Sequence, residues 1–348
     1  PPVADPKRRA AGEALFKTFC ETYFPHRFYL AWSPDHLKVI DRIERAIEQG
    51  GQFALAMPRG DGKTSLLEAA VIWATSKGRR LFVMLIGASR AAALESMDAI
   101  KAELEINELL AADFPEICVP VQKLEGIANR CAGQLHAGER THIGWAKDQV
   151  VLPSIAGSKA SGAIIRVAGI TGCIRGAKFS RADGKTVRPD LVLIDDPQTD
   201  KSAKSETQCQ QRETIIAGAI LGLGGPDEKI ATFCTCTVVR SGDLADLLLD
   251  RDKHPEWQGE RCKLLYAFPS NTKLWEDYSI KRSDSLKNDG DGREATAFYK
   301  THRKAMDAGA IEAWPERHKP DEISGLQHAM NLKLDNEAAF FAEYQNEP

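Results

Sequence analysis

Apolar residues follow two alternating patterns along the first half of the chain. Short unbroken apolar runs, which are typical of buried strands, alternate with stretches in which apolar residues recur every three or four positions, which are typical of helices. Strands are predicted at residues 52–57, 81–86, 191–194 and 229–237, and helices at 34–49, 63–77 and 90–104. This alternation predicts an α/β fold with a mostly parallel central sheet flanked by helices.

The pattern changes after residue 265, where the sequence becomes helical and more polar. A domain boundary is therefore expected between residues 265 and 275. We predict an N-terminal leader or helix at residues 1–24, a core domain at 25–268 and a small helical C-terminal lid subdomain at 269–348. Residues 1–11 are basic and proline-rich and lack the apolar run of a signal peptide, so a flexible leader is expected there.

Composition and charge narrow the classes of protein that fit this chain. Its 348 residues are 43% hydrophobic and 27% charged, as in ordinary globular proteins. No stretch approaches the roughly 20 apolar residues that span a bilayer, so no membrane segment is predicted. The eight cysteines include no C-x-x-C pair, which predicts reduced, mostly buried thiols rather than a zinc or dithiol site. With a net charge of -3, a polyanion would have to bind a local basic patch.

The strongest local signal lies between the first predicted strand and the helix after it. The segment reads Met57-Pro58-Arg59-Gly60-Asp61-Gly62-Lys63-Thr64-Ser65. Glycines let backbone N–H groups wrap a phosphate, a lysine reaches the β- and γ-phosphates, and a hydroxyl binds Mg²⁺. Gly60, Gly62, Lys63 and Thr64 supply these parts, and the following helix offers its positive N-terminus to the anion. Met57 replaces the usual first glycine, but the strand–loop–helix context is the one that this motif requires. We therefore predict that residues 58–65 bind ATP.

Arg59 adds a second cation inside this loop. A guanidinium beside the phosphates can offset the charge that spreads onto the γ-oxygens during hydrolysis. Arg59 is therefore predicted to be catalytic as well as nucleotide-binding, like Lys63. The alternative is a surface arginine that contacts only water.

Two adjacent carboxylates, Asp195 and Asp196, follow the third predicted strand. Parallel α/β sheets bind their ligands at the carboxyl ends of the strands, so both are expected near the loop. Asp195 continues the strand and is expected to bind Mg²⁺ together with Thr64. Asp196 is expected to orient and deprotonate the attacking water, a place where many related ATPases have glutamate. The sequence leaves open which of the two carboxylates polarises the water.

Together with two later segments, these features resemble the ATPase domain of the large subunit of phage DNA-packaging terminases. The later segments are the run Cys234-Thr235-Cys236-Thr237 and a closing region with Trp314-Pro315-Glu316-Arg317 and the final pattern Phe340, Phe341, Tyr344, Gln345, Asn346 and Pro348. The segment Arg188-Pro189-Asp190, which precedes the two carboxylates, also resembles that ATPase domain. The resemblance spans roughly residues 25–348.

The resemblance implies an ASCE-type P-loop ATPase that requires Mg²⁺ and hydrolyses ATP to drive double-stranded viral DNA into a procapsid. It implies that Thr235 and Thr237 sense the γ-phosphate. It also places Trp32 and His36 where related ATPases contact adenine, although core packing explains Trp32 equally well. In terminases an RNase H-like nuclease domain usually follows the ATPase domain. The resemblance covers the ATPase domain alone, so no endonuclease activity is expected from these residues.

The same resemblance implies a set of partners. These are DNA bound through its backbone phosphates, a portal protein, a small terminase subunit, and further copies of this chain in a ring during packaging. The expected location is the cytoplasm of the bacterial host, with transient attachment to the procapsid portal. No membrane partner is expected.

A glycine-containing basic segment, predicted to be flexible, lies between residues 159 and 188. Its single aromatic residue does not indicate base stacking, whereas its cations suit backbone phosphates or a neighbouring subunit. Such contacts are expected from Lys159, Lys178, Arg181 and Lys185. Arg166 and Arg175 are candidates for an arginine that acts in a neighbouring subunit's site, and Arg175 is favoured because glycines flank it. A solvated charged loop is the alternative.

Two other functions are alternatives to DNA packaging. The first is another P-loop nucleic-acid translocase, such as a helicase-like enzyme, but the roughly 80 residues after residue 265 are too few for a second RecA-like domain. The second is a non-catalytic nucleotide-binding switch or scaffold. The complete set of Lys63, Thr64, Asp195 and Asp196 argues against a switch, and a phosphate-release assay separates the two.

Overall fold

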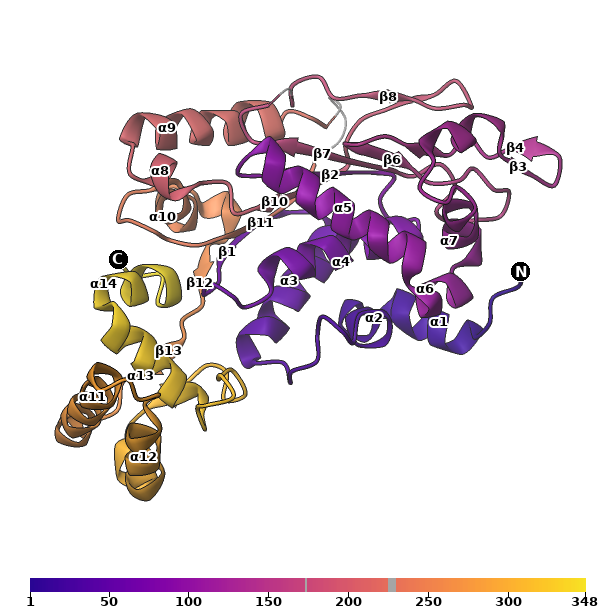
Figure 1. Cartoon of the computed structure of the whole chain (residues 1–348). Coiled ribbons are helices and arrows are strands. Elements are labelled where there is room, and N and C mark those ends of the chain that lie inside the picture. Colours follow the sequence, from indigo (N-terminus) through magenta and orange to yellow (C-terminus); the bar gives the residue numbers. More distant parts are fainter. Residues whose placement is uncertain (173, 225–229) are drawn as a thin grey trace.

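In the computed structural model, which describes residues 1–172, 174–224 and 230–348, eight strands form one central sheet (Figure 1). Their order across the sheet is β12-β1-β11-β10-β2-β7-β6-β5. The bounds in that order are Glu260–Arg261, Gln52–Ala56, Ala231–Cys236, Leu191–Asp195, Phe82–Gly87, Ile164–Gly169, Gln149–Val151 and Gly144–Trp145. Strands β12 to β7 run parallel, and β6 and β5 are antiparallel to their neighbours. The predicted α/β fold with a mostly parallel sheet is confirmed.

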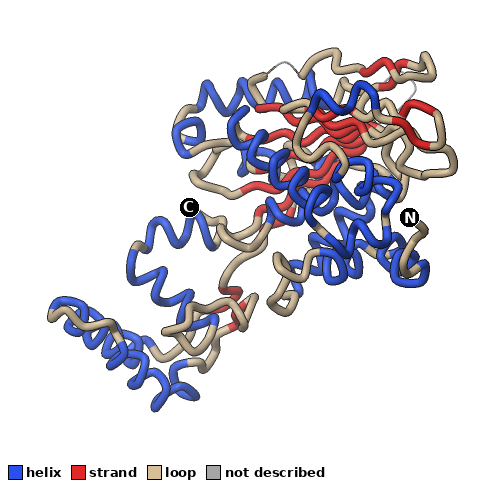
Figure 2. The backbone as a smooth tube through the Cα atoms, turned by 45° about the vertical axis from the view of Figure 1, so that its right-hand side comes forward, coloured by secondary structure: helices blue, strands red, loops and turns tan. Residues whose placement is uncertain are grey.

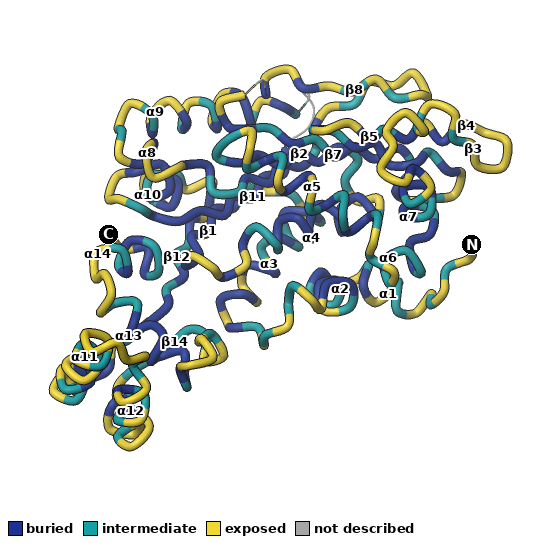
Figure 3. Tube along the Cα trace, viewed as in Figure 1, coloured by how far each residue is buried: buried dark blue, intermediate teal, exposed yellow. Residues whose placement is uncertain are grey.

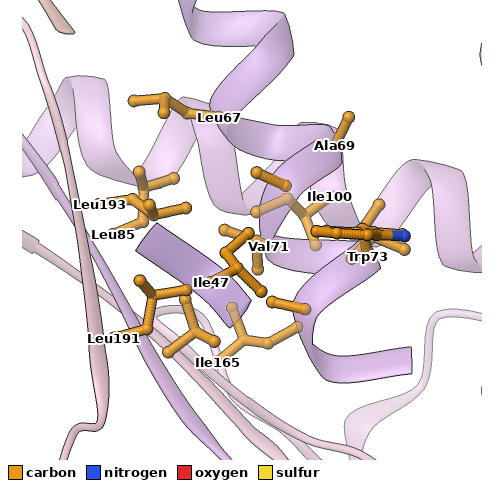
Figure 4. Close-up of a cluster of buried hydrophobic side chains, with 14 of the residues drawn as sticks. Ile47, Leu67, Ala69, Val71, Trp73, Leu85, Ile100, Ile165, Leu191 and Leu193 are labelled. Carbon is orange, nitrogen blue, oxygen red and sulfur yellow. The ribbon is translucent and has the colours of Figure 1, made fainter. Parts of the chain in front are cut away.

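Both faces of the sheet are covered by helices, which explains why its central strands are apolar throughout. On one face, Leu85, Leu191 and Leu193 pack against α3 (Pro34–Gln49), α4 (Lys63–Ser76) and α5 (Arg90–Ile106) (Figure 4). The alternate residues, such as Met84 and Ile194, face α9 (Glu206–Ile215) and α10 (Leu244–Leu249). Figure 3 shows the buried interior that results. Burying each such large aliphatic side chain stabilises the fold by about 1.5–3 kcal/mol.

Helix α4, which follows the predicted loop, is buried on nearly every side. Its outer surface is covered by α1 (Pro6–Ala14) and α2 (Phe16–Tyr23). The ring of Phe16 lies 5.3 Å from that of Trp73, whose indole N–H donates to the carbonyl of Gly12 at 2.9 Å. A helix buried all round has an apolar sequence without a polar face, as α4 does. The loop at its start is thus attached to one of the most rigidly packed elements of the fold.

The N-terminal residues depart from the sequence prediction. Residues 1–11 were expected to form a flexible leader, but Pro6–Ala14 form helix α1, and the Asp5 side chain accepts hydrogen bonds from the first helical N–H groups. Arg8 pairs with Asp113 at 2.6 Å, and Arg9 pairs with Glu116 at 2.6 Å. These ion pairs hold α1 against α6 (Glu108–Asp113) and α7 (Pro115–Gln122). The basic residues that suggested a solvated leader are therefore structural.

The basic segment also differs from its prediction, because residues 164–169 form the buried strand β7 rather than a flexible region. The segment's second half contains a small hairpin of β8 (Phe179–Ser180) and β9 (Thr186–Val187). The remaining short elements are η1 (Ala128–Gly133), β3 (Leu135–His136), β4 (Glu139–Arg140), α8 (Asp200–Ala203), η2 (Ile216–Ile220) and η3 (Pro255–Trp257). The predicted strand 229–237 is observed as β11, although Lys229 lies outside the described residues.

Residues 264–348, here called the C-terminal subdomain, extend away from the central sheet as a largely helical group (Figure 2). They have a hydrophobic cluster of their own. Their elements are β13 (Leu265–Ala267), α11 (Thr272–Lys287), α12 (Arg293–Met306), β14 (Ile311–Glu312), α13 (Gly325–Asp335), α14 (Glu337–Ala339) and η4 (Phe340–Tyr344). The end of the chain returns to the sheet, where Asn346 accepts from the N–H of Val238 at 3.0 Å and donates to the carbonyl of Cys262 at 2.8 Å. The subdomain is thus anchored to the core at both of its ends.

The described residues also bear on the predictions about membrane segments and cysteines. No helix among them combines the length and apolar character needed to cross a bilayer. The seven described cysteines are all free, and six are buried, as predicted, with Cys131 partly exposed. Cys173 lies outside the described residues.

Candidate functional site

Residues 58–62 connect the carboxyl end of β1 to the first residue of α4, as the sequence predicts. Gly60 and Gly62 adopt left-handed backbone conformations with φ of 86° and 75°. Side chains strongly disfavour such angles, which explains glycine at both places. Gly62 is the N-cap of α4, and no side chain caps this end of the helix. The first N–H groups of the helix are therefore oriented for an anion.

Lys63 joins the loop to the second predicted carboxylate. Its Nζ lies 2.7 Å from Oδ2 of Asp196 and also donates to the hydroxyl of Thr237. The lysine is almost fully buried, and Asp196 is the carboxylate with which it forms an ion pair. A phosphate arriving in the loop would meet a buried cation that already faces the ends of β10 and β11.

Thr64 and Asp195 form the second contact between the loop and the strand ends. The Thr64 hydroxyl donates to Oδ2 of Asp195 at 2.7 Å, and the Thr235 hydroxyl donates to Oδ1 at 3.0 Å. Burial, reinforced by the neighbouring Asp196, raises the pKa of Asp195, while the hydrogen bonds from Thr64 and Thr235 oppose this shift. Both oxygens of the carboxylate thus point into the predicted site.

Asp196 takes a direction different from that of Asp195. Its backbone is left-handed, with φ of 45°, while its N–H donates to the carbonyl of Thr235 at 2.9 Å. Its carboxylate accepts from the N–H of Thr237 at 3.2 Å and from the Thr237 hydroxyl at 3.3 Å. A left-handed aspartate costs conformational energy, and such residues concentrate at functional sites. The carboxylate is held by three groups yet remains partly open to solvent.

Of the two predicted sensor threonines, Thr235 lies in β11, between the loop strand and the carboxylate strand, and Thr237 directly follows that strand. In the parallel ladders, Thr235 pairs with Leu55 of β1 on one side and with Asp195 of β10 on the other. Every residue of this strand is buried, and the two threonine hydroxyls lie at and just beyond its carboxyl end. The order of the strands therefore brings six predicted residues together: Lys63, Thr64, Asp195, Asp196, Thr235 and Thr237.

Arg59 is not part of this cluster. Its guanidinium is exposed and bonded to Oε2 of Glu343 at 2.7 Å, and its backbone N–H donates to the Glu343 carbonyl at 2.9 Å. The hydrogen bond from Arg59 to Glu343 raises the pKa of the arginine. In this structure the loop arginine therefore points to the C-terminal subdomain.

Trp32 and His36 lie beside the loop, lining a pocket of about 290 Å³ with Gly60, Asp61 and Trp314. Burial lowers the pKa of His36, which favours the neutral form of its ring. Its Nε2 lies 3.0 Å from the Asp61 carbonyl, which can only accept, and its Nδ1 lies 2.7 Å from the Ser33 hydroxyl. Both ring nitrogens are therefore used within the protein. His36 thus supports the loop backbone, and the residues that line the pocket include the aromatic Trp32 and Trp314.

The predicted basic contacts separate in space. Lys159 pairs with Glu13 at 2.5 Å, and its backbone lies against Gly78, beyond the end of α4 that is opposite to the loop. Arg166 lies in β7, where it donates to Gln149 at 2.8 Å and covers the Phe82 ring. Arg175 is exposed in the segment after β7. Of the two candidates for an arginine acting in a neighbouring site, Arg175 is therefore the more accessible.

Three other predicted cations lie in or next to the β8–β9 hairpin. Lys178 and Lys185 are exposed, whereas Arg181 faces Asp183 at 3.6 Å and the carbonyl of Ser161 at 3.4 Å. The hairpin packs on the sheet through Phe179 and Val187. These lysines are thus available for a polyanion, and Arg181 is partly engaged.

The sequence interpretation missed Gln198, which lies two residues after the carboxylates. Its amide donates to the Thr237 carbonyl at 3.0 Å and to Oδ2 of Asp243 at 2.8 Å, while its own buried Oε1 has no partner in the structure. It fixes the segment after Asp196 to the end of β11. An amide residue so soon after a pair of carboxylates was the signal available in the sequence.

The oxygen ligands present fit a magnesium site that is completed by a nucleotide. Mg²⁺ binds few protein ligands and takes phosphate oxygens and water for the rest. The Thr64 hydroxyl and the Asp195 carboxylate are adjacent, at 2.7 Å, and of the right chemical type. Among the described residues, no group of three or more His, Cys, Asp or Glu side chains could hold a metal by itself.

Comparisons with known proteins give no independent assignment of this site. The interpretation of the site therefore depends on its residues and their geometry. No protein-family model matches the chain, and no curated protein matches it either.

Proposed function

We propose that this chain is a Mg²⁺-dependent ATPase whose nucleotide binds to residues 58–65, with the γ-phosphate facing β10 and β11. One observation carries the proposal. Three segments distant in the sequence supply a buried lysine, two hydroxyls and two carboxylates, joined by hydrogen bonds and an ion pair at the carboxyl edge of a parallel sheet. Ligands of open α/β sheets bind at this edge.

Each residue then has a role that its contacts support. Thr64 and Asp195 would hold Mg²⁺, which would neutralise charge on the phosphates. Lys63, paired with Asp196 in this structure, turns to the β- and γ-phosphates. Asp196 is then released to accept a proton from the attacking water, whose oxygen bonds to the γ-phosphorus as the bond to the β-phosphate oxygen breaks. Thr237, which contacts both Lys63 and Asp196, is placed to respond to that exchange.

The arrangement of the strands favours the ASCE type of P-loop ATPase. In that type, an additional strand separates the strand before the loop from the strand that ends in the metal-binding aspartate. Strand β11 separates β1 from β10 in this way. Together with the resemblance of residues 25–348 to terminase large subunits, this supports a motor that moves double-stranded DNA into a procapsid.

The partners follow from the same proposal. Lys178 and Lys185 are exposed and can contact DNA phosphates without reading sequence. The portal protein and small terminase subunit are the proposed protein partners, in a ring of this chain at the procapsid portal in the host cytoplasm. Arg175 is the proposed arginine that reaches the neighbouring subunit's site.

Phosphate release from ATP, measured with and without linear double-stranded DNA, tests the proposal. We expect Mg²⁺-dependent hydrolysis that DNA stimulates. Nucleotide binding without phosphate release would favour a switch, and strand separation in a helicase assay would favour a helicase-like translocase. Absence of both binding and hydrolysis would reject the nucleotide site itself.

A further inference from the structure

The C-terminal subdomain reaches the loop through Arg317, which lies in the turn between β14 and α13. One terminal nitrogen of its guanidinium donates to Oδ1 of Asp61, and the other donates to the backbone carbonyl of Arg59. A side-chain carbon built on Gly60 would lie 3.1 Å from the Arg317 guanidinium. The guanidinium therefore lies directly on the loop and bonds residues on either side of Gly60.

The ion pair between Arg317 and Asp61 is buried, and an aromatic ring lies beside it. The side chains of Arg317 and Asp61 are only 13% and 10% exposed. The guanidinium carbon lies 5.6 Å from the centre of the Tyr344 ring, which limits its orientation. Burial raises the pKa of Asp61 to about 6, and the positive charge of Arg317 opposes that shift. Without Arg317, a buried carboxylate in the loop would lose its main counter-charge.

The core domain also holds Asp61, through the backbone carbonyl of that residue. His36 of α3 bonds to the Asp61 carbonyl, and the Trp314 ring lies 4.5 Å from the His36 ring. The Trp314 indole donates to the carbonyl of Ala31 at 2.7 Å. Asp61 is therefore fixed through its backbone by the core and through its carboxylate by the C-terminal subdomain.

We propose that Arg317 is a positioning residue for nucleotide binding, which holds residues 58–62 in the conformation that presents their N–H groups to the phosphates. This inference depends on the proposed ATPase function. Two of the guanidinium's groups are bonded to Asp61 and Arg59, so Arg317 acts through the loop and contacts no reacting atom. Nucleotide affinity then depends on the C-terminal subdomain of the same chain, and not on the loop sequence alone.

Four variants test this role. Arg317→Ala removes both contacts, Arg317→Lys keeps the charge but cannot span both acceptors, and Asp61→Asn removes the acceptor's charge. Arg282→Ala is the matched control, because Arg282 lies in the same subdomain, is 21% exposed and pairs with Asp335 at 2.6 Å. Hydrogen–deuterium exchange of residues 58–64 without nucleotide reports the order of the loop. Titration with MgATP and steady-state kinetics report affinity and turnover.

We expect Arg317→Ala to speed exchange in the loop and to weaken MgATP binding at least about tenfold, with kcat lowered less than about threefold, because a buried charge pair is broken. Arg317→Lys should recover part of the affinity. In the Asp61→Asn background, Arg317→Ala should have a smaller effect than in the wild type, because the two residues share one interaction. Arg282→Ala should match the wild type in all three measurements.

Two results would overturn the inference. One is exchange and affinity in Arg317→Ala equal to those of the Arg282→Ala control. The other is a fall in kcat at unchanged affinity, which would mean that Arg317 acts on the phosphates directly. If Arg317→Ala does not fold, Arg317→Lys and Asp61→Asn decide by the same criteria. Failure of the wild-type chain to bind MgATP would instead reject the ATPase proposal, and the exchange measurement would still show whether Arg317 orders the loop.

Discussion

The cluster at the strand ends and the contact of the loop with the C-terminal subdomain are built differently. The first consists of side chains at or directly after the ends of neighbouring parallel strands and at the start of the helix after β1, and the ladder register sets where those strands end. The second consists of Arg317 on Asp61 and Glu343 on Arg59, side chains from a subdomain with its own hydrophobic cluster. Strand register therefore sets one group of contacts, and packing between two units sets the other.

This difference suggests a division of labour around the loop. Groups fixed by the sheet keep the same geometry in every state that preserves the sheet, which suits residues that act on the reacting phosphate. Groups contributed by a separately packed unit can change with its position, which suits control of affinity. Variants of the cluster should therefore mainly lower kcat, and Arg317 variants should mainly raise KM. Arg59 lies in the contact in this structure but is predicted to act on the phosphates, so its variant is a separate test. The predictions below test this division.

Lys63→Ala should have the largest effect and abolish ATP turnover. It removes the buried cation that faces Asp196 and that would bridge the β- and γ-phosphates. Phosphate release measures the effect, and Lys273→Ala, an exposed lysine of α11 paired with Asp277, is the control. Turnover of Lys63→Ala within about threefold of the control would contradict the assignment of the loop.

Arg59→Ala tests whether the exposed loop arginine belongs functionally to the cluster. If Arg59 leaves Glu343 and stabilises the transferring phosphoryl group, kcat should fall by about 10³ or more, with KM little changed. This is the result that we expect. An exposed ion pair alone is worth under about 1 kcal/mol, so the two roles differ greatly in size.

A rise in KM alone after Arg59→Ala would place Arg59 with Arg317 on the affinity side of the comparison. Arg175 would then be the better candidate for the catalytic arginine, acting on the neighbouring subunit. Mixing Arg175→Ala subunits with Lys63→Ala subunits would reveal such a contact by recovered activity. A ring that assembles without recovering activity would exclude Arg175.

Asp196→Asn should lower kcat by about 10² or more while leaving nucleotide binding nearly intact, because an amide cannot accept the proton from water. Asp195→Asn should instead weaken binding in a Mg²⁺-dependent way, since its carboxylate lies beside Thr64. Nucleotide titrations at several Mg²⁺ concentrations, together with turnover, separate the two. Reversed phenotypes would exchange the roles of the two carboxylates.

Much of the sheet was predictable because its central strands are continuous apolar runs. The predicted run 52–57 corresponds to Gln52–Ala56, and 81–86 to Phe82–Gly87. Strand β7 was missed because Arg166 interrupts its apolar run and glycines are frequent around it. In the structure that arginine is accommodated by Gln149 and the Phe82 ring, a tertiary contact that local pattern does not reveal. Strand β12, with two residues, is too short to give any pattern.

The residues of the candidate site likewise divide into those that the sequence predicts and those that it does not. Lys63, Thr64, Asp195 and Asp196 were predictable because strand ends in a parallel sheet converge on one edge. Arg317 and Glu343 were not predictable as partners of the loop, because their contacts depend on how the C-terminal subdomain packs. Their segments had been noted only for their resemblance to terminases. The direction of Arg59 depends on the same packing, which explains why it does not join the cluster in this structure.

Glu322→Gln should have the smallest effect on turnover and a measurable effect on stability. Glu322 accepts from His328 at 2.7 Å, from Asn331 at 2.8 Å and from the Lys319 N–H at 2.8 Å. Burial raises its pKa, but these hydrogen bonds prevail and lower it to about 2. A glutamate with a lowered folded-state pKa stabilises the fold above its unfolded pKa of about 4.5, and this contribution is lost as pH falls from 4.5 towards 2.

We expect Glu322→Gln to lower the free energy of unfolding by about 1–3 kcal/mol at pH 7. The difference from the wild type should shrink below pH 4.5 in urea unfolding. Glu337→Gln, which breaks an exposed pair with Lys333, is the control and should cost under about 1 kcal/mol in free energy of unfolding.

His328, a partner of Glu322, also lines the pocket beside the loop, so MgATP affinity should also be measured in Glu322→Gln. Reduced stability with unchanged affinity would confine nucleotide control to Arg317 and its contact with Asp61, whereas reduced affinity would extend it into the C-terminal subdomain.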